Sequence, residues 1–377
     1  MNEANHDAKD SAGLSFGIFG AGSIGCYLGA NLAAAGVPVV LLGRAALGEE
    51  IREHGLRVTD LTGRDFRVAS PDSPDEVAAK AFRYSTDPAD LKNCDVILIT
   101  TKSSDTEEAA RTLADIGLKD EAIVISFQNG VGNARIVRET LNTKGAGAPR
   151  VLAGMVPYNV VRNPQAHFHC GTTGKLMFAD APVGQAADEA CARRLAEIAK
   201  TLSKAGLAAE THPDLQGVLW GKLIFNLNNA VNALAGVPLR EELSQRAYRK
   251  IVAASIREAL SVMKAAGVRP RAAGRMIPGI APVILGLPDF LFFRVAAPMV
   301  KIDPEARSSM WEDLNRGRKT EIDFITGEIV RLAEEHGIPQ RAPIARATVA
   351  LIKAAEAAGQ GSPGLSAADL ARALKID

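Results

Sequence analysis

The feature that most constrains the fold is a glycine-rich loop between two short apolar runs near the start of the chain. Residues 14–20 (LSFGIFG) are apolar enough for a buried strand, and the loop from Gly20 to Gly25 (GAGSIG) follows at once. Small residues at helical spacing then run to Gly36, and residues 37–44 (VPVVLLGR) form a second β-branched run. A strand, a helix and a strand in direct succession predict the first unit of a parallel α/β sheet.

The loop has the GxGxxG pattern of dinucleotide-binding proteins. It consists of Gly20, Ala21, Gly22, Ser23, Ile24 and Gly25. The first glycine permits a tight turn, the second lets the backbone approach a pyrophosphate, and the third lets helix and strand pack closely. N–H groups at the start of the helix then face the anion. A tight turn without a ligand is the alternative, and the position between a strand and a helix favours cofactor binding.

The end of the second strand indicates which cofactor is bound. An NAD-binding unit places Asp or Glu there to hold the ribose 2′-hydroxyl, but this chain has Gly43 and Arg44 instead. A carboxylate would repel a 2′-phosphate, whereas an arginine pairs with it as a fork. We therefore predict NADP(H), with an ordinary surface role for Arg44 as the alternative.

Strand signals continue through the first half of the chain and then stop. They predict a hairpin over 55–70 with its turn at Thr62-Gly63, strands over 94–102, 121–130, 151–161 and 174–179, and a helix over 188–205. After a hinge at 212–214, the predicted elements are helices over 215–235, 241–266, 308–336 and 343–358. The prediction is an α/β N-terminal Rossmann-type dinucleotide-binding domain plus an all-α C-terminal domain. The expected limits are a disordered extension over 1–13, an NADP-binding domain over 14–212 and a helical substrate and catalytic domain over 213–377.

Charge and cysteine usage exclude several classes of function. The 377 residues include 44 basic and 43 acidic ones, for a net charge of +1, which gives no attraction to nucleic acid or a membrane surface. The four cysteines are far apart in sequence and form no CxxC motif. This spacing indicates neither a disulfide framework nor a zinc site and fits a cytoplasmic protein. His167 and His169 are two apart, and a chance pair is favoured over metal ligands. Residues 1–13 lack the apolar run of a signal peptide.

Residues 219–234 (LWGKLIFNLNNAVNAL) are predicted to form one mostly apolar helix that carries a polar stripe. At 100° per residue, Lys222, Asn226 and Asn229 lie at about 0°, 40° and −20° and so share one face. Polar groups on a buried helix are costly unless something polar meets them. A structural hydrogen-bond network or a lysine that reaches water is the simpler interpretation, and the helix alone slightly favours it.

Polar residues also follow two predicted strands. Ligands of open α/β sheets gather beyond the carboxyl ends of the strands, where Lys102 and Asn129 stand. A solvated loop is as good an interpretation of Lys102 as cofactor contact. Asn129 is followed by Gly130-Val131-Gly132, and because glycines allow close approach of a ligand, a role with cofactor and substrate is favoured there.

The stretch from Ser308 onward begins with a helix-start signature, in which Ser309 is followed by Glu312 three residues later. Ser309 is thus a candidate helix cap or a candidate substrate contact. On one continuous helix, Glu321 would lie about 120° round from Ser309, on another side of a shared pocket.

Taken together, these motifs resemble the ketopantoate reductase (2-dehydropantoate 2-reductase) family over roughly residues 14–358. The matching stretches are GAGSIG (20–25), TTK (100–102), QNGVG (128–132), WGKLIFN (220–226) and SSMWEDLNRGRKTEID (308–323). The last two are the most specific. The resemblance implies NADPH-dependent reduction of 2-dehydropantoate to (R)-pantoate, on the way to pantothenate and coenzyme A.

The resemblance also implies roles for individual residues. It makes Lys222 the proton donor, Asn226 and Ser309 substrate ligands, Asn129 a contact of both cofactor and substrate, and Lys102 and Glu321 cofactor-side contacts. The family pattern has an asparagine eight residues after the lysine, where this chain has Ala230. Asn229 stands one residue earlier, on the lysine face, and is the candidate to replace it.

Other departures leave the substrate open. A further asparagine that the family pattern places near residue 240 is missing, with Arg240 close by, and the proline-broken apolar segment 274–304 is longer than in shorter members. That segment is predicted to pack on the core, or to form a lid or a subunit contact such as a homodimer interface. Two other functions compete: a dehydrogenase of another 2-keto acid or an opine, and an NADP-sensing protein without turnover. The joint presence of Lys222, Asn226 and Glu321 argues against the second.

Overall fold

The computed structural model describes residues 13–69, 82–143, 149–272, 277–296 and 305–376. The expected disordered extension falls almost wholly outside these ranges. The chain divides into two compact units: the first takes the chain up to Gln128 and Gly132–Leu215, and the second takes Asn129–Val131 and Gln216–Asp377. The sequence-based division at residue 212 lies close to the junction of Leu215 and Gln216.

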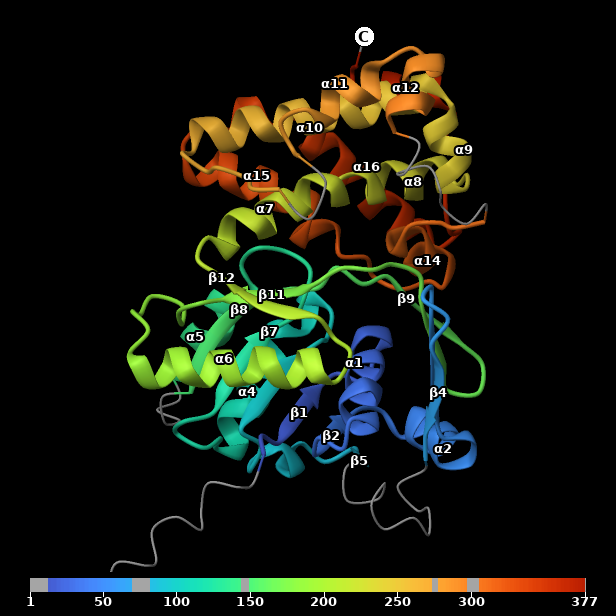
Figure 1. The fold of residues 1–377 in the computed structure, drawn as a ribbon. Helices are drawn as coiled ribbons and strands as arrows, with labels where there is room; N and C mark the ends of the chain where they lie inside the picture. The colour runs from blue at the N-terminus through green and yellow to red at the C-terminus, as the bar shows by residue number, and fades with distance from the viewer. Residues whose placement is uncertain (1–12, 70–81, 144–148, 273–276, 297–304, 377) are drawn as a thin grey trace, which may run out of the picture. The chain divides into compact units, whose positions relative to one another are not determined.

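The first unit contains an eight-stranded sheet within the described ranges, in the order β12-β11-β8-β7-β6-β1-β2-β5 (Figure 1). Its strands are β1 (Phe16–Phe19), β2 (Val39–Leu42), β5 (Phe82–Ser85), β6 (Val96–Ile99), β7 (Ile123–Ser126), β8 (Arg150–Met155), β11 (Leu176–Ala179) and β12 (Ala209–His212). All neighbours are parallel except β8 and β11. From β5 to β8 the strands follow the 3-2-1-4-5-6 order of a Rossmann sheet, which confirms the predicted class.

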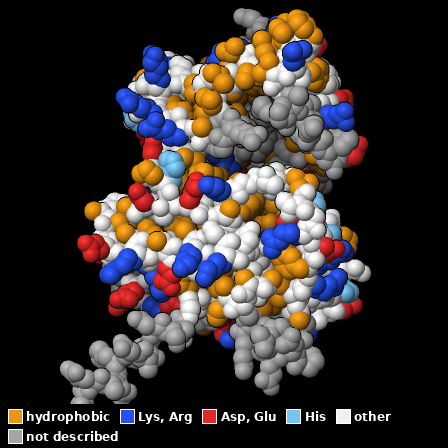
Figure 2. Space-filling view, in the orientation of Figure 1, with side chains coloured by type: hydrophobic (Ala, Val, Ile, Leu, Met, Phe, Trp, Pro, Cys, Tyr) orange, Lys and Arg blue, Asp and Glu red, His pale blue; other side chains and the backbone are white. Residues whose placement is uncertain are grey.

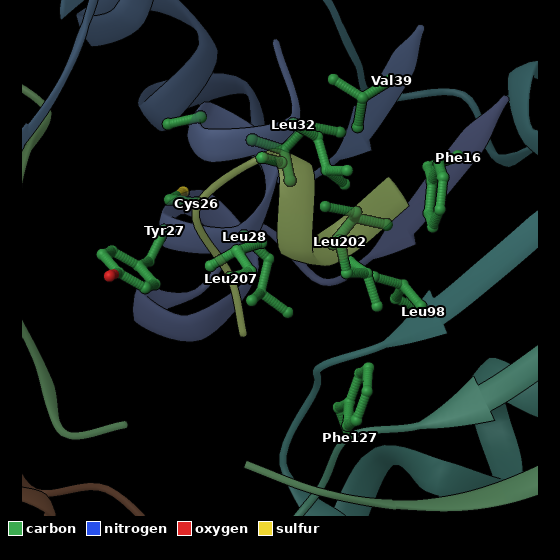
Figure 3. Close-up of a cluster of buried hydrophobic side chains, with 14 of the residues drawn as sticks. Phe16, Cys26, Tyr27, Leu28, Leu32, Val39, Leu98, Phe127, Leu202 and Leu207 are labelled. Atoms are coloured by element: carbon green, nitrogen blue, oxygen red, sulfur yellow. The ribbon is translucent and has the colours of Figure 1, made fainter. Parts of the chain in front are cut away.

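Helices cover both faces of this sheet, which is why its central strands are apolar throughout. All four residues of β6 (VILI) are buried, as expected for a strand covered on both faces. Leu98 packs with α1 (Ser23–Ala34) and α6 (Glu189–Lys204), as in Figure 3, while Ile97 and Ile99 pack with α4 (Thr106–Ile116) and α5 (Asn133–Thr143). The two buried clusters fix the sheet, so that the carboxyl ends of β1, β2, β6 and β7 form one edge.

A second sheet of the first unit has the order β4-β3-β10-β9 and packs on α1. Its strands are β3 (Leu56–Asp60), β4 (Asp65–Val68), β9 (Val160–Asn163) and β10 (His167–Cys170). The antiparallel pair β3–β4 confirms the hairpin. The single strand predicted over 151–161 is wrong, since it divides into β8 and β9. Pro157 stands between them, and proline cannot donate to a strand ladder.

The two histidines of β10 share one hydrogen-bond partner. The Thr59 Oγ1 lies 2.8 Å from the His167 Nε2 and 2.8 Å from the His169 Nδ1. Within the described ranges, no group of three or more potential metal ligands occurs. Both imidazole rings are therefore hydrogen-bonding neighbours of one threonine hydroxyl.

The described part of the second unit is helical, as predicted. It comprises α7 (Leu215–Asn226), α8 (Asn228–Ala235), α9 (Leu239–Ser244), α10 (Arg246–Ala265), α11 (Ala281–Gly286), α12 (Asp289–Val295), α14 (Ser309–Asn315), the short helix η3 (Ile322–Phe324), α15 (Thr326–Glu335), η4 (Pro339–Arg341), α16 (Pro343–Ala358) and α17 (Ala367–Ala373). Helix α10 packs against α8, α9, α11, α15, α16 and α17. None of the helices in the described ranges has both the length and the apolar character that a membrane span requires.

Three of the predicted helices are each interrupted. The helix predicted over 241–266 divides at Gln245, which is extended at φ −97° and ψ 113° and precedes α10. The helix predicted over 308–336 divides into α14, η3 and α15. Helix α14 ends early because Gly317 adopts φ +62° and the Arg318 N–H donates to the Asp313 carbonyl at 2.8 Å. The stretch 219–234 is interrupted only at Leu227, which keeps helical angles of φ −58° and ψ −28°, so α8 continues the path of α7.

Candidate active site

The glycine loop is held against two strand ends of the first unit by backbone contacts. The N–H groups of Gly20 and Ala21 both donate to the Leu42 carbonyl, at 3.2 and 2.8 Å. Gly20 has φ +114°, and a Cβ there would lie 2.9 Å from the Thr101 backbone nitrogen. Only glycine combines this angle with this close approach, so the first position of the motif is a steric requirement of the turn.

The other two glycines of the motif face opposite environments. A Cβ on Gly25 would lie 2.1 Å from the Gly20 carbonyl oxygen, which also accepts a bond from the Thr100 hydroxyl at 2.7 Å. A Cβ on Gly22 would meet nothing within 4 Å, and Gly22 is exposed. No side chain caps the start of α1, where Gly22 is the cap residue. The first turn therefore offers N–H groups to open space, which fits a phosphate group.

Arg44 stands beside this loop. A Cβ on the preceding Gly43 would lie 2.4 Å from the Ala21 Cβ, so the end of β2 and the loop are in direct contact. Arg44 is exposed, and its carbonyl accepts a bond from the Tyr84 hydroxyl at 2.8 Å. The backbone at Arg44 is thus fixed while its guanidinium faces solvent next to the loop. This fits the cationic partner that a ribose 2′-phosphate needs.

Lys102, the predicted cofactor contact after β6, is positioned by a buried residue that the sequence analysis did not single out. Gln128 Nε2 donates to the Lys102 carbonyl at 3.2 Å and to the Thr106 hydroxyl at 2.9 Å. The Thr106 hydroxyl lies 2.9 Å from Asn133 Oδ1. Gln128 precedes Asn129 in the QNG stretch. The sequence signal for it was an amide residue directly after a strongly apolar strand, where a polar side chain needs hydrogen-bond partners.

In the second unit, the predicted proton donor meets an acid and an amide from distant parts of the sequence. Lys222 lies on α7 and is partly buried. Burial lowers the pKa of Lys222 to about 8, and the negative charge of Glu321 opposes this change. Asn129 Nδ2 donates to Glu321 Oε2 at 3.1 Å. The structure therefore brings Lys222, Glu321 and Asn129 into one polar cluster.

Glu321 does not lie on the helix of Ser309. It precedes η3 in a turn whose backbone is held by another helix: the Thr320 N–H donates to Glu356 Oε1 at 2.7 Å. The angular relation predicted for a continuous helix is therefore wrong, because the positive φ of Gly317 ends α14 first. Glu321 instead reaches the lysine from this anchored turn.

The other predicted substrate residues lie along α7, α8 and α14. Asn226 is one turn after Lys222 on α7, so the two share a face. The cap of α14 is Ser308, whose hydroxyl accepts a bond from the Trp311 N–H at 3.2 Å. The Ser308 hydroxyl also donates to the Asn229 carbonyl at 3.0 Å. Ser309 is thus not the cap, and its side chain is exposed in the first turn.

Comparison with known families agrees with this arrangement in both halves of the chain. Residues 16–182 match the model described as "Ketopantoate reductase PanE/ApbA", and residues 214–356 match "Ketopantoate reductase PanE/ApbA C terminal". The chain belongs to the ketopantoate reductase family.

Relatives within this family are distant but nearly full-length. A 2-dehydropantoate 2-reductase of Archaeoglobus fulgidus is 28% identical over 322 residues, which cover 85% of this chain and 91% of the relative. The crystal structure of a PanE/ApbA family ketopantoate reductase from Ralstonia eutropha JMP134 has 27% identity and a TM-score of 0.72, covering 92% of this chain and 100% of that one. D-mandelate dehydrogenase with NADH and anilino(oxo)acetate shares the ketopantoate reductase fold at 20% identity and a TM-score of 0.69, covering 92% and 99%.

Proposed function

We propose that this protein reduces 2-dehydropantoate to (R)-pantoate with NADPH, a step toward pantothenate and coenzyme A. The observation that carries the proposal is the cluster of Lys222, Glu321 and Asn129, in which burial lowers the pKa of the lysine to about 8. A general acid works best when its pKa lies near the operating pH. An ammonium in this cluster can therefore release a proton near neutral pH.

The cofactor assignment rests on the first unit. When bound, NADPH supplies the hydride that the ketone carbon receives. The open first turn of α1 at Gly22 holds the pyrophosphate, Arg44 pairs with the 2′-phosphate, and Lys102 adds a positive charge at the same sheet edge. Ala21, Ser23 and Ile24 complete the loop between the three glycines.

The second unit supplies the proton and holds the substrate. The Lys222 ammonium stabilises the oxygen that becomes negative as the ketone is reduced, and then protonates it. Asn129 and Asn226 bind the keto acid beside the lysine, and Asn229 and Ser309 bind its far end. Glu321 keeps Lys222 charged, because a neighbouring negative charge opposes the effect of burial on the lysine.

One observation favours a second candidate, the reduction of another 2-keto acid. The family pattern expects asparagines where this chain has Ala230 and, nearby, Arg240. Ala230 is buried and apolar, so it offers no hydrogen bond to a substrate. An opine-type dehydrogenase on the same scaffold belongs to this alternative.

A panel of substrates separates these functions. NADPH oxidation is followed with 2-dehydropantoate, pyruvate, 2-ketoisovalerate and phenylglyoxylate, each with NADPH and NADH. We expect 2-dehydropantoate to have the highest kcat/KM, and NADPH to be preferred to NADH. A higher kcat/KM for another acid would establish the second candidate, and NADPH binding without turnover of any acid would indicate an NADP-sensing protein.

We further propose a cytoplasmic homodimer that uses the surface of α11 and α12. Several apolar side chains there are exposed, including Val283 at 68% and Phe290 at 73%, and Figure 2 shows hydrophobic side chains gathered over these helices. Exposed apolar patches of this kind mark contact surfaces. Light scattering should give a dimer for the wild type and a monomer for Phe290→Asp, and a monomeric wild type would contradict the proposal.

A further inference from the structure

Glu242 of α9 is a buried carboxyl group without a basic partner among the described residues. Its side chain is 0% exposed, and none of the ion pairs within the described ranges includes it. Its Oε2 accepts a bond of 2.6 Å from Asn232 Nδ2 of α8. Its Oε1 is buried and has no hydrogen-bond partner. A charged carboxylate is costly in this position, because no cation among the described residues replaces its water and the amides of Asn232 and Asn228 offset the effect of burial only in part.

A second unsatisfied acceptor lies within reach. The Asn228 amide interacts with the Glu242 carboxyl in an orientation that favours the charged carboxylate, an effect smaller than that of burial, and Asn228 Oδ1 is itself buried without a partner. A neutral carboxylic acid has one O–H donor, which an ionised one lacks. A proton on Glu242 therefore supplies the donor that these two acceptors need, and the amide of Asn228 can turn to receive it.

We propose that Glu242 is a neutral carboxylic acid that positions the keto-acid site by holding Asn228 and Asn232. Burial raises the pKa of this carboxyl to about 8, which agrees with a neutral group at pH 7. Because Asn228 and Asn232 lie on α8, the helix after that of Lys222, and Asn232 also bonds the Ser308 N–H at the start of α14, Glu242 is a positioning residue that acts through its neighbours.

The link from Glu242 to the site runs through Asn232. The Asn232 amide donates to Glu242 Oε2 and to the Val237 carbonyl at 3.0 Å, while its Oδ1 accepts a bond of 2.8 Å from the Ser308 N–H. All three bonds fix one orientation of the amide. The amide in turn fixes the residue immediately before Ser309.

The same network holds the joint between α7 and α8. Asn228 is the first residue of α8, directly after the interruption at Leu227. The Ser308 hydroxyl donates to the Asn229 carbonyl at 3.0 Å. Glu242 therefore sets the spacing between the amides that follow Lys222 and the start of α14. Since these are the proposed substrate contacts, this inference rests on the proposed function.

The test compares two substitutions of Glu242 with a matched control. Glu242→Gln keeps a neutral side chain of the same shape with one acceptor and one NH₂ donor group, so the keto-acid KM should stay within about twofold of wild type. Glu242→Leu removes both hydrogen bonds, so KM should rise about tenfold, as expected for a loss of about 1.4 kcal/mol. NADPH affinity should not change in either variant. Glu241→Gln, at the exposed neighbour on α9, is the control and should match wild type.

Three results would overturn the proposal: Glu242→Gln raising KM as much as Glu242→Leu, neither variant raising KM, or both lowering NADPH affinity equally. If Glu242→Leu does not fold, Asn228→Ala takes its place and should raise KM by about three- to tenfold. Infrared difference spectra of wild type against Glu242→Gln at pH 7 detect the protonated carboxyl without any substrate. They should show its band, and its absence would refute the neutral state. If the wild type reduces no keto acid, the proposed function fails, while the spectra still decide the state of Glu242.

Discussion

The glycine loop of the first unit and the Lys222 cluster of the second unit are built from different parts of the chain. The loop uses backbone atoms: its shape depends on three glycines within six consecutive residues, and a Cβ at Gly25 would lie 2.1 Å from a carbonyl oxygen. The cluster uses side chains from three separate segments, with Lys222 on α7, Glu321 in the turn before η3 and Asn129 in the short segment Asn129–Val131.

This difference determines how each region responds to mutation. Substitution by any residue other than proline leaves the backbone N–H groups in place, so the loop is sensitive mainly to added volume. The cluster can lose a functional group without a change of fold, because each side chain is held by its own helix or turn. We therefore expect cofactor binding and proton transfer to be separable by mutation.

The largest expected effect is on turnover. Lys222→Ala should lower kcat by about 10²–10⁴-fold, since it removes the general acid, while the NADPH dissociation constant stays at the wild-type value. Steady-state kinetics and NADPH fluorescence titration measure the two quantities. Lys250→Ala removes an exposed lysine of α10 and serves as the control. Near-wild-type turnover in Lys222→Ala would remove the lysine from the mechanism.

A pair of loop variants tests the backbone region. Gly25→Ala forces a Cβ against the Gly20 carbonyl oxygen, and the loop must shift to relieve the clash. We expect the strain to lower Tm. We expect the shifted loop to lose about 3 kcal/mol of NADPH binding free energy, which is a roughly 100-fold weaker affinity. Gly22→Ala meets no protein atom, so it should keep the Tm of wild type but weaken NADPH binding by occupying cofactor space. Equal Tm losses in the two variants would contradict the difference between these glycines.

A smaller effect is expected at Arg44. Arg44→Ala should raise the KM for NADPH about tenfold and leave that for NADH unchanged, because only NADPH carries the 2′-phosphate. Arg52→Ala, at another exposed arginine of α2 (Ala45–His54), controls for loss of charge. If both cofactors lose affinity equally, Arg44 does not recognise the phosphate.

The sequence predicted the backbone region better than the side-chain region, for physical reasons. A glycine motif between a strand and a helix is local, so Gly20 to Gly25 could be placed without knowing the rest of the fold. The contact of Asn129 with Glu321 joins residues 192 apart in sequence, and no periodicity contains that information. The resemblance to the family supplied those residues, while their geometry required the structure.

Helix ends were the least predictable feature. Periodicity continued through Gly317 and Gln245, and only the backbone angles show that α14 ends and that α9 separates from α10. Adjacent serines also left the cap ambiguous, and Ser308 rather than Ser309 takes it. Glu242 stood in a helix of ordinary charge pattern, so its burial could not be read from neighbouring residues.

The pH dependence of kcat tests most directly whether the Lys222 ammonium donates the proton. Burial lowers the pKa of Lys222 from 10.5 to about 8, and the protonated form is the one required. At saturating keto acid and NADPH, kcat should therefore be constant below about pH 7 and fall as pH rises through about 8, approaching tenfold per pH unit. Burial also raises the pKa of Glu242 to about 8, so Glu242→Gln is the control. An unchanged midpoint in that variant would show that the fall in kcat reflects Lys222. A kcat that stays constant up to about pH 10 would contradict the account.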